Sequence, residues 1–361
     1  MAYTTINKST DYFNTKLYTG NGSSSYAITG VGHQPDFVWI KKRDGTVNHL
    51  LHDSIRGVTK LLVSNTNAAE DTNTNILNSF DSDGFTVGSN SASNDNNGPF
   101  ASWNWKAGTT SGQATNSYST ITPTSISFNQ TSGFSIVKYT GNGTAGAGVP
   151  HGLGKKPEFV IIKKTSATDS WICYHQGISN NGTTYIVLNS TNGNGTSNNP
   201  FNGWQPDTTN FSLGSAGDTN ASGATFIAYC FANVNGFSKI GSYTGSGGTN
   251  YPFIYTGFKP AFVMVKRTNS TSNWVMYDNK RQYNNIEGQY NPQRPRLASN
   301  LNSAESSFTS DNGVDLLSNG FVVRDNSNDD YTINISGSTY IYMAFAEAPL
   351  VGSNNVPCTA R

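Results

Sequence analysis

One phrase occurs three times in this chain and constrains its fold more than any other feature. Each copy has a Gly-x-x-Pro turn, one spacer residue, a short apolar run and two cations, at residues 32–42, 154–164 and 257–267. Gly permits a tight turn, Pro cannot continue a hydrogen-bonded ladder, and the run is too short for a helix. The phrase therefore predicts a β-strand buried on both faces, whose closing cations return the chain to water.

Further phrases surround each copy in the same order. A Tyr-Thr-Gly-x-Gly phrase begins at residues 18, 139 and 243, and we interpret it as a hairpin turn, because it lacks the Gly-Lys-Ser/Thr ending of a phosphate-binding loop. A short segment that we call the aromatic slot follows each copy, at residues 49–53, 171–175 and 274–278. After it come a strand that opens with Gly or Asn and a closing strand rich in aromatic residues. Five phrases in one order predict an internal triplication.

The strands are separated by Asn-Gly, Asp-Gly and Ser-Gly turns, and no segment has a convincing 3.6-residue period. We expect an all-β fold of three tandem β-sandwich domains, of the jelly-roll or concanavalin-like kind. The predicted domains are repeat 1 (11–107), repeat 2 (133–234) and repeat 3 (235–349). An N-terminal arm (1–10), a linker rich in Ser, Thr and Gly (108–132) and a C-terminal tail (350–361) complete the chain. Alternating apolar residues in the linker, Ile121, Ile126 and Phe128, predict an added strand.

Composition narrows the functional classes. Charged residues make up only 12% of the 361 residues, against about 25% in typical proteins, and the net charge is +1. This near-neutral balance argues against nucleic acid and anionic lipid as partners, and no apolar run is long enough for a membrane span. Aromatic residues are plentiful, so the chain is expected to fold. The N-terminal residues lack the features of a secretory signal, and the three cysteines predict neither a disulfide framework nor a metal site.

The aromatic slot holds the candidate contact residues. Repeat 1 places His49 and His52 there, next to Asp53. On a strand, positions 49 and 52 face opposite sides, which weakens a joint metal or acid–base role. The corresponding residues in repeats 2 and 3 are aromatic, so the slot is more typical of packing or partner contact. Because flat rings stack on sugars when exposed and fill cores when buried, the candidate glycan or partner contacts are His49, His52, Trp171, Tyr174, Trp274, Tyr277 and Trp204.

Catalytic signatures are lacking in the sequence. It has no nucleophile elbow, no paired-carboxylate motif and no HExxH pattern, so we expect neither an enzyme nor a cofactor. Asp81-Ser82-Asp83-Gly84 resembles the start of a calcium loop but lacks the later ligands, and a polar turn is the simpler interpretation. A lectin that stacks sugars on exposed rings remains an alternative function. A polysaccharide-degrading enzyme would need two acids in one groove and ranks last.

The phrases together resemble a family of virion proteins of tailed bacteriophages, common in marine phages and often labelled tail fibre. The residues that carry the resemblance are Tyr18–Gly22, Gly32–Lys41, His49–Gly57, Phe80–Val87, Trp103–Gly108 and Ala346–Gly352. Repeat 2 departs from the frame in its middle. The resemblance implies a virion component with lectin-like β-sandwich modules, made in the host cytoplasm without a signal peptide, and it brings no catalytic residues.

We therefore expect a structural virion protein, most directly a tail-fibre or appendage subunit that contributes to host-surface attachment. A capsid decoration or head-fibre protein and a carbohydrate-binding lectin are the alternatives. The expected partners are other virion proteins and a host cell-surface glycan. Appendages are generally closed oligomers, so we expect a homotrimer. The insertion 279–296, with its arginines Arg281, Arg294 and Arg296, together with the polar arm and tail, is more than a monomer needs and favours such assembly. The N-terminal arm would anchor to the virion.

Overall fold

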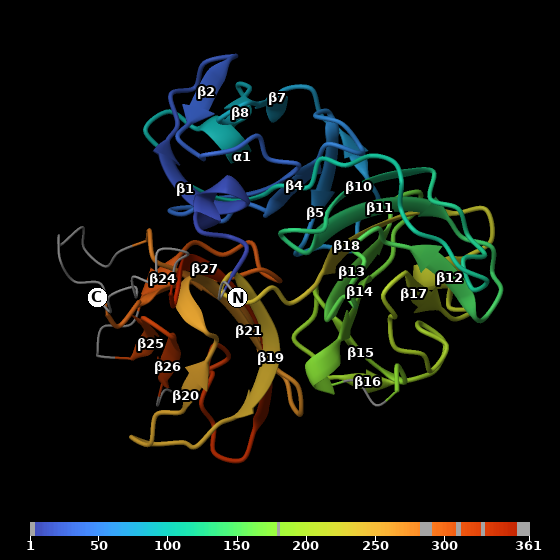
Figure 1. The fold of residues 1–361 in the computed structure, drawn as a ribbon. Helices are drawn as coiled ribbons and strands as arrows, with labels where there is room; N and C mark the ends of the chain where they lie inside the picture. The colour runs from blue at the N-terminus through green and yellow to red at the C-terminus, as the bar shows by residue number, and fades with distance from the viewer. Residues whose placement is uncertain (1–3, 179–180, 282–290, 308–311, 326–328, 352–361) are drawn as a thin grey trace.

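The computed structural model describes residues 4–178, 181–281, 291–307, 312–325 and 329–351. These residues form antiparallel sheets with two four-residue α-helices and two 3-10 turns, so the predicted all-β class is confirmed. Figure 1 shows three lobes, one per repeat, arranged around a common centre near which the N-terminus lies. Each lobe has a large sheet and a small one.

The elements of each repeat follow in chain order. Repeat 1 contains η1 (Ser9–Asp11), β1 (Phe13–Thr19), β2 (Tyr26–Thr29), β3 (Phe37–Lys42), β4 (Leu50–Asp53), β5 (Lys60–Val63), β6 (Asp71–Thr72), β7 (Leu77–Asp81), β8 (Gly84–Val87), α1 (Ser91–Asn94) and β9 (Pro99–Trp105). Repeat 2 and the linker contain β10 (Ser125–Asn129), β11 (Phe134–Thr140), β12 (Ala147–Pro150), β13 (Phe159–Lys164), β14 (Trp171–His175), η2 (Gln176–Ile178), β15 (Thr184–Val187), β16 (Gly195–Thr196), β17 (Asn210–Leu213), α2 (Gly217–Asn220) and β18 (Thr225–Phe231). Repeat 3 contains β19 (Ser238–Thr244), β20 (Phe253–Tyr255), β21 (Phe258–Arg267), β22 (Trp274–Asp278), β23 (Pro295–Ala298), β24 (Ser306–Ser307), β25 (Gly313–Leu317), β26 (Gly320–Arg324) and β27 (Thr339–Pro349).

The strand order of the large sheet recurs in each repeat. It is β1-β9-β3-β4-β5-β6 in repeat 1 and β19-β27-β21-β22-β23-β24 in repeat 3. Repeat 2 has β11-β18-β13-β14-β15-β16 and one added edge strand, β10, which pairs with β11. The small sheets are β2-β8-β7, β12-β17 and β20-β26-β25. Equivalent positions follow from the strand registers, and they place Phe37, Phe159 and Phe262 at the same point of each sheet.

The apolar strands are buried on both faces, as their sequence predicts. In β3, Val38 and Ile40 pack toward the small sheet of repeat 1, whereas Phe37 and Trp39 point into a core shared by all three repeats. In β13 the same alternation directs Val160 and Ile162 to one side and Phe159 and Ile161 to the other. Successive side chains of a strand point to opposite faces. Each large sheet therefore lies between its own small sheet and the other repeats.

Three equivalent aromatic residues mark the centre of the shared core. Trp105, Phe231 and Phe345 occupy equivalent positions in the closing strands of their repeats, and their ring centroids lie 5.7–6.2 Å apart in all three pairings. Neighbouring rings extend the cluster. Phe37 stacks on Tyr229 of repeat 2 at 4.4 Å, and Phe13 stacks on Phe345 of repeat 3 at 4.8 Å. The chain thus has an approximate threefold arrangement within one polypeptide, rather than three sandwiches strung in series.

Several expectations about local structure are wrong. The first cation after each apolar run does not return to water, because Lys41, Lys163 and Lys266 are fully buried. The Tyr-Thr-Gly-x-Gly phrase is not a hairpin turn: β1 pairs with β9, β2 pairs with β8, and the phrase crosses between the two sheets. The Gly-x-x-Pro turn is also absent from repeat 3, where strand takes its place. Pro260 lies within β21 at a register shift, where a missing N–H is tolerated.

The segments outside the repeats are also packed. Ile6 of the expected arm is 1% exposed and belongs to the shared core, so the described part of residues 1–10 does not project from the molecule. The linker packs against repeat 2, and its predicted strand is present as β10, which contains Ile126 and Phe128. Ile121 is buried in the same core but lies outside the strand. Cys173 and Cys230 are buried and unpaired, while Cys358 lies outside the described residues, as does the tail beyond residue 351.

The shared core predicts that one central substitution weakens the whole molecule. Replacing Phe231 by Ala removes a ring that contacts repeats 1 and 3, and we expect the free energy of unfolding to fall by about 3–5 kcal/mol. Chemical denaturation followed by tryptophan fluorescence and circular dichroism measures the loss. Tyr255→Ala, at a 55% exposed position, is the control and should change stability little. A loss below about 1 kcal/mol at Phe231 would contradict the central role of the cluster.

Candidate functional site

Six of the seven predicted contact residues lie inside the molecule. His49, His52, Trp171, Tyr174, Trp274 and Tyr277 are each at most 2% exposed. They therefore present no ring face to a glycan on the molecular surface. The shared core between repeats covers Trp171 and Trp274, whereas the core within repeat 2 covers Tyr174. Burial lowers the pKa of His52 to about 3, with the nearby Arg56 charge as a second cause, so this imidazole is neutral at physiological pH.

The slot joins each repeat to the preceding one. The indole Nε1 of Trp171 in repeat 2 donates to the carbonyl of Val63 in repeat 1 at 3.0 Å. The indole of Trp274 in repeat 3 donates to the equivalent carbonyl of Val187 in repeat 2, also at 3.0 Å. His49 holds this position in repeat 1 and accepts from the Trp39 indole at 2.8 Å. The predicted partner contact is therefore made within the chain.

The three buried lysines follow the same cycle. Lys163 donates to the Asn67 carbonyl of repeat 1 at 3.3 Å, and Lys266 donates to the Thr191 carbonyl of repeat 2 at 2.9 Å. Lys41 closes the ring by donating to the Asn302 carbonyl of repeat 3 at 3.3 Å. Burial lowers the pKa of Lys41 and Lys163 to about 8 and that of Lys266 to about 7. Lys163 and Lys266 each donate to two carbonyl oxygens, which the two N–H groups of a neutral amine can also satisfy.

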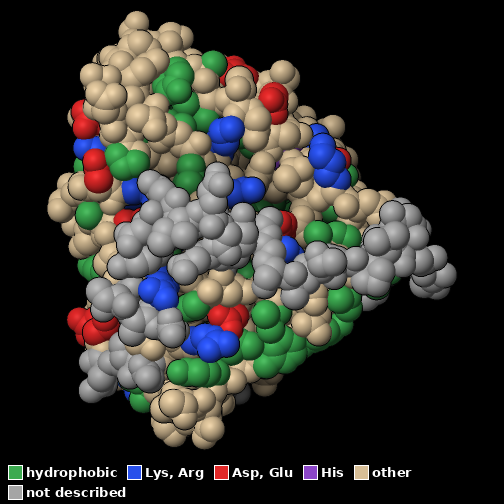
Figure 2. Space-filling model, turned by 90° about the vertical axis from the view of Figure 1, so that its left-hand side faces the viewer, with side chains coloured by type: hydrophobic (Ala, Val, Ile, Leu, Met, Phe, Trp, Pro, Cys, Tyr) green, Lys and Arg blue, Asp and Glu red, His purple; other side chains and the backbone are tan. Residues whose placement is uncertain are grey.

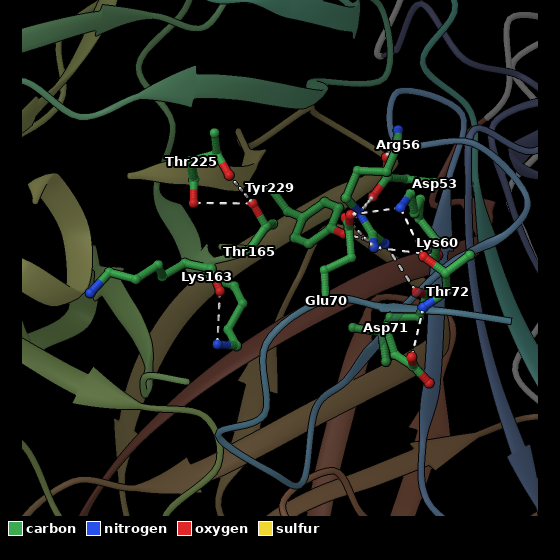
Figure 3. A network of polar contacts seen from close by, with 12 residues as sticks. Asp53, Arg56, Lys60, Glu70, Asp71, Thr72, Lys163, Thr165, Thr225 and Tyr229 are labelled. Atoms are coloured by element: carbon green, nitrogen blue, oxygen red, sulfur yellow. Dashed lines mark hydrogen bonds and ion pairs between the residues drawn. The ribbon is translucent and has the colours of Figure 1, made fainter. Parts of the chain in front are cut away.

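An Asp-Arg-Glu triad fills the interface between repeats 1 and 2 (Figure 3). Arg56 donates to Asp53 at 2.6 Å and to Glu70 at 3.4 Å, and the side chains of Asp53 and Arg56 are fully buried. The Tyr229 hydroxyl of repeat 2 donates to the same Asp53 oxygen at 2.7 Å. A charge-assisted pair with a further donor satisfies the carboxylate away from water. The triad therefore fastens repeat 1 to repeat 2.

The same triad fills the interface between repeats 3 and 1. Arg281 donates to Asp278 at 2.6 Å and to Glu305 at 3.2 Å, and the Trp103 indole of repeat 1 donates to Asp278 at 3.1 Å. Arg43 of repeat 1 adds a bidentate pair with Glu305, at 2.7 and 3.0 Å. Burial alone would raise the pKa of Asp278, but the Arg281 charge and hydrogen bonds outweigh it, so this pKa lies below its usual value.

The interface between repeats 2 and 3 lacks the triad. The strand registers place His175 at the position equivalent to Asp53 and Asp278. Ile178 then occupies the position of the triad arginine, and Asn194 occupies the position of the triad glutamate. His175 donates through Nε2 to the Tyr342 carbonyl of repeat 3, 3.2 Å away, while its Nδ1 accepts from the Gly177 amide at 3.0 Å. Burial lowers its pKa to about 4, partly opposed by that carbonyl. Met343 occupies the position at which Tyr229 and Trp103 donate to the carboxylate in the other two interfaces. The carboxylate and its aromatic donor are therefore both replaced in this interface.

Sequence reasoning missed the triads, although a signal was present. Repeats 1 and 3 share an Asp-x-x-Arg spacing and a later Glu, and repeat 2 has neither. The assignment of Arg281 to subunit assembly is wrong, since the side chain is fully buried in the triad. Arg296 is also committed inside the chain, by an ion pair with Asp329 at 2.7 Å. Residues 282–290 of the same insertion lie outside the described residues.

Trp204 is the predicted contact residue that reaches the surface. It is 47% exposed and lies edge to face with Tyr118, which is 56% exposed, at a centroid distance of 5.6 Å. Tyr118 comes from the linker, whose backbone bonds to the carbonyl of Gly148 in β12. A Cβ at Gly148 would lie 2.1 Å from the Tyr118 carbonyl oxygen, so only glycine lets the linker approach so closely. The two rings form one side of a pocket of about 250 Å³.

The floor of this pocket is polar. Asn210 holds it in shape by accepting from Ser119 and donating to Asn116, each at 2.8 Å. Asp207 and Ser212 also line it, and the buried Ser212 hydroxyl has no hydrogen-bond partner among the described residues. Exposed rings beside hydroxyl, amide and carboxylate groups suit a ligand with both apolar faces and hydroxyl groups. The pocket is the candidate contact site.

Other classes of site find little support in the described part of the chain. Asp83 accepts from the backbone amides of Gly30 and Gly32 at 2.9 and 2.7 Å, as expected for a polar turn. Among the residues the structure describes, no three His, Cys, Asp or Glu side chains gather closely enough to hold a metal ion. No helix in this part of the chain is long and apolar enough to cross a membrane.

Comparison with known proteins adds a family. A family model described as a domain of unknown function, DUF7483, matches residues 8–349. The chain belongs to the DUF7483 family. Its model spans all three repeats and the linker, so the closed arrangement of three repeats lies within one family unit. Searches of curated proteins and of solved structures find no match to this chain.

The buried lysines predict a pH dependence of stability. Burial lowers the folded pKa of Lys266 to about 7, below its unfolded value of about 10.4. Between these values the unfolded chain binds a proton that the folded chain lacks, so stability rises with pH from about 7 to 10. The variant Lys266→Met should reduce this slope by up to about 1.4 kcal/mol per pH unit. Denaturant unfolding at pH 7, 8 and 9 measures it, with the exposed Lys280→Met as control; equal slopes in all proteins would contradict the prediction.

The triads predict that substitutions destabilise the three interfaces to different extents. Arg281→Met leaves Asp278 buried without its cation, and we expect the free energy of unfolding to fall by about 3–5 kcal/mol. The double variant Asp278→Leu/Arg281→Met should recover much of that loss, because the unpaired charge is gone. Ile178→Met, at the equivalent position of the interface without a triad, should cost less than about 1.5 kcal/mol. Denaturant unfolding distinguishes these outcomes, and equal losses at positions 281 and 178 would refute the assigned role.

Proposed function

We propose that this chain is a structural component of a bacteriophage virion, most directly a tail-fibre or appendage subunit that contributes to host-surface attachment. The resemblance of its phrases to tailed-phage virion proteins supports this proposal. The structure adds a physical argument. Three sandwiches that share one core form a rigid body, and a rigid body holds its binding surfaces in a fixed geometry.

The surface also supports a particle component that faces the outside of a cell. Figure 2 shows Lys, Arg, Asp and Glu side chains of both signs dispersed over the face in view, with no large area of a single charge. The strongest charge groups described above, the two triads, are buried between repeats and stabilise the interfaces. Carboxylates held this way are not available as a general acid and base in an open groove. The proposed role is therefore structural and non-enzymatic.

The contact site of this proposal is the pocket beside Tyr118 and Trp204. Its exposed rings can stack on a sugar, while Asn210, Asp207 and Ser212 offer acceptors and donors to hydroxyl groups. A host cell-surface glycan is the ligand that this chemistry favours. A lectin role is then one part of attachment rather than a competing function.

The approximate threefold arrangement favours one alternative, a capsid decoration or head-fibre protein. Equivalent surfaces of repeats 1, 2 and 3 surround the axis through Trp105, Phe231 and Phe345. A single chain with this shape matches a threefold or quasi-threefold position on a shell. A homotrimer, the other route to threefold contact, remains a prediction that light scattering of the purified chain tests.

Labelling intact particles tests the proposal and separates its two forms. Gold-labelled antibodies against the folded chain should bind purified phage particles, at the tail if the chain is an appendage subunit and over the head if it decorates the capsid. Particles lacking the gene should carry no label and, for an appendage, adsorb to host cells at least tenfold more slowly. Absence of the chain from purified particles by mass spectrometry would refute a virion role.

A further inference from the structure

Two adjoining clefts open at the interface between repeats 2 and 3. One has a volume of about 540 Å³ and lies between β15, β16 and the loop after β21. The other has a volume of about 400 Å³ and lies between η2, β19 and the start of β27. Asn194 and Thr268 line both clefts, so the two clefts adjoin at these residues, and we refer to the pair of clefts as the depression. The Asn194 backbone amide donates to the Thr268 carbonyl at 2.7 Å, which fixes the two repeats at this point.

The depression lies where the triad is missing. Ile178 and Asn194, which line it, occupy the places of the arginine and the glutamate at the other two interfaces. In those interfaces Arg56 and Arg281 are fully buried and reach across to Glu70 and Glu305. A branched apolar side chain and a short amide occupy less space than a guanidinium paired with a carboxylate. The substitutions in repeat 2 therefore account for an opening at this interface.

The walls are polar but carry no charge. Amide and hydroxyl groups line them, from Asn192, Asn194, Thr268, Asn269 and Thr271, and no Lys, Arg, Asp or Glu among the described residues does. Tyrosine rings stand among these groups. Tyr185 lies against Gly195, where a Cβ would be 2.6 Å from the ring, so glycine lets the ring rest on the backbone. In the second cleft Tyr243 stacks on Tyr340 at 5.0 Å.

We propose that this depression, defined by Asn194 and Thr268, binds an uncharged oligosaccharide. Such a ligand brings hydroxyl groups for the amides and hydroxyls of the walls, and carbon–hydrogen faces for the half-buried rings of Tyr185 and Tyr243. An anionic or cationic ligand would be desolvated there without a counter-charge, which is unfavourable. The volumes of the two clefts, about 540 and 400 Å³, suit several sugar units rather than one. This site is separate from the Tyr118–Trp204 pocket, with which it shares no lining residue.

The test uses neutral hexasaccharides of glucose, mannose and galactose as probes, titrated into the full chain by calorimetry. All measurements are made in the Trp204→Ala background, so that the other pocket does not contribute. We expect at least one probe to bind. Adding Asn194→Glu, at an exposed position, should weaken that binding at least tenfold, because the carboxylate must be desolvated. Asn96→Glu, at an exposed position of repeat 1 outside the clefts, is the matched control and should leave binding unchanged.

A second variant rebuilds the triad and tests the origin of the site. His175→Asp/Ile178→Arg/Asn194→Glu should fill the depression and abolish binding, and its melting temperature shows whether it has folded. If that variant does not fold, Asn194→Glu and Asn269→Asp carry the test. The proposal is overturned if no probe binds the Trp204→Ala chain at 10 mM, if Asn194→Glu and Asn269→Asp bind like their parent, or if an oligogalacturonate binds more tightly than every neutral probe. Labelling of particles tests virion location independently of these outcomes.

Discussion

The whole structure depends on strands that are apolar on both faces. A sandwich of two sheets covers one face of each sheet and leaves the other to water, which for residues such as Phe37 and Phe159 would expose large rings. This chain covers the second faces by closing three large sheets around Trp105, Phe231 and Phe345. Each repeat then depends on the other two for part of its core. Independent domains joined by linkers would not bury the same surface.

Closure around an axis creates a second problem, because polar strand ends enter the interfaces. Each interface solves it with side-chain to backbone hydrogen bonds in the same cyclic sense, from Lys41, Lys163 and Lys266 and from the slot tryptophans. Where a carboxylate is buried, an arginine and an aromatic donor accompany it. Where Met343 takes the place of the aromatic donor, the neutral His175 takes the place of the carboxylate. The repeats therefore differ in a coordinated manner, as expected if an unpaired buried charge is too costly to keep.

The sequence allowed much of the fold to be predicted and little of the site. Repeated phrases located β3, β13 and β21, and the uninterrupted apolar runs indicated burial on both faces. Such a run does not say what covers the second face, so the shared centre could not be inferred. The sequence predicts that Lys41 faces solvent, because sequence alone cannot place a neighbouring repeat over it. Tyr118 lies in a polar linker, and its pairing with Trp204 depends on how that linker packs along β12.

A single chain with approximate threefold symmetry permits what three identical subunits cannot. In an exact homotrimer every interface has the same residues, so opening one interface opens all three and removes every triad at once. Here repeats 1 and 3 keep Asp53–Arg56–Glu70 and Asp278–Arg281–Glu305, while repeat 2 replaces the set with His175, Ile178 and Asn194. Two interfaces then hold the body together, and the third is free to acquire a cleft. Covalent linkage of the repeats is the condition that lets stability and ligand binding be assigned to different interfaces of one body.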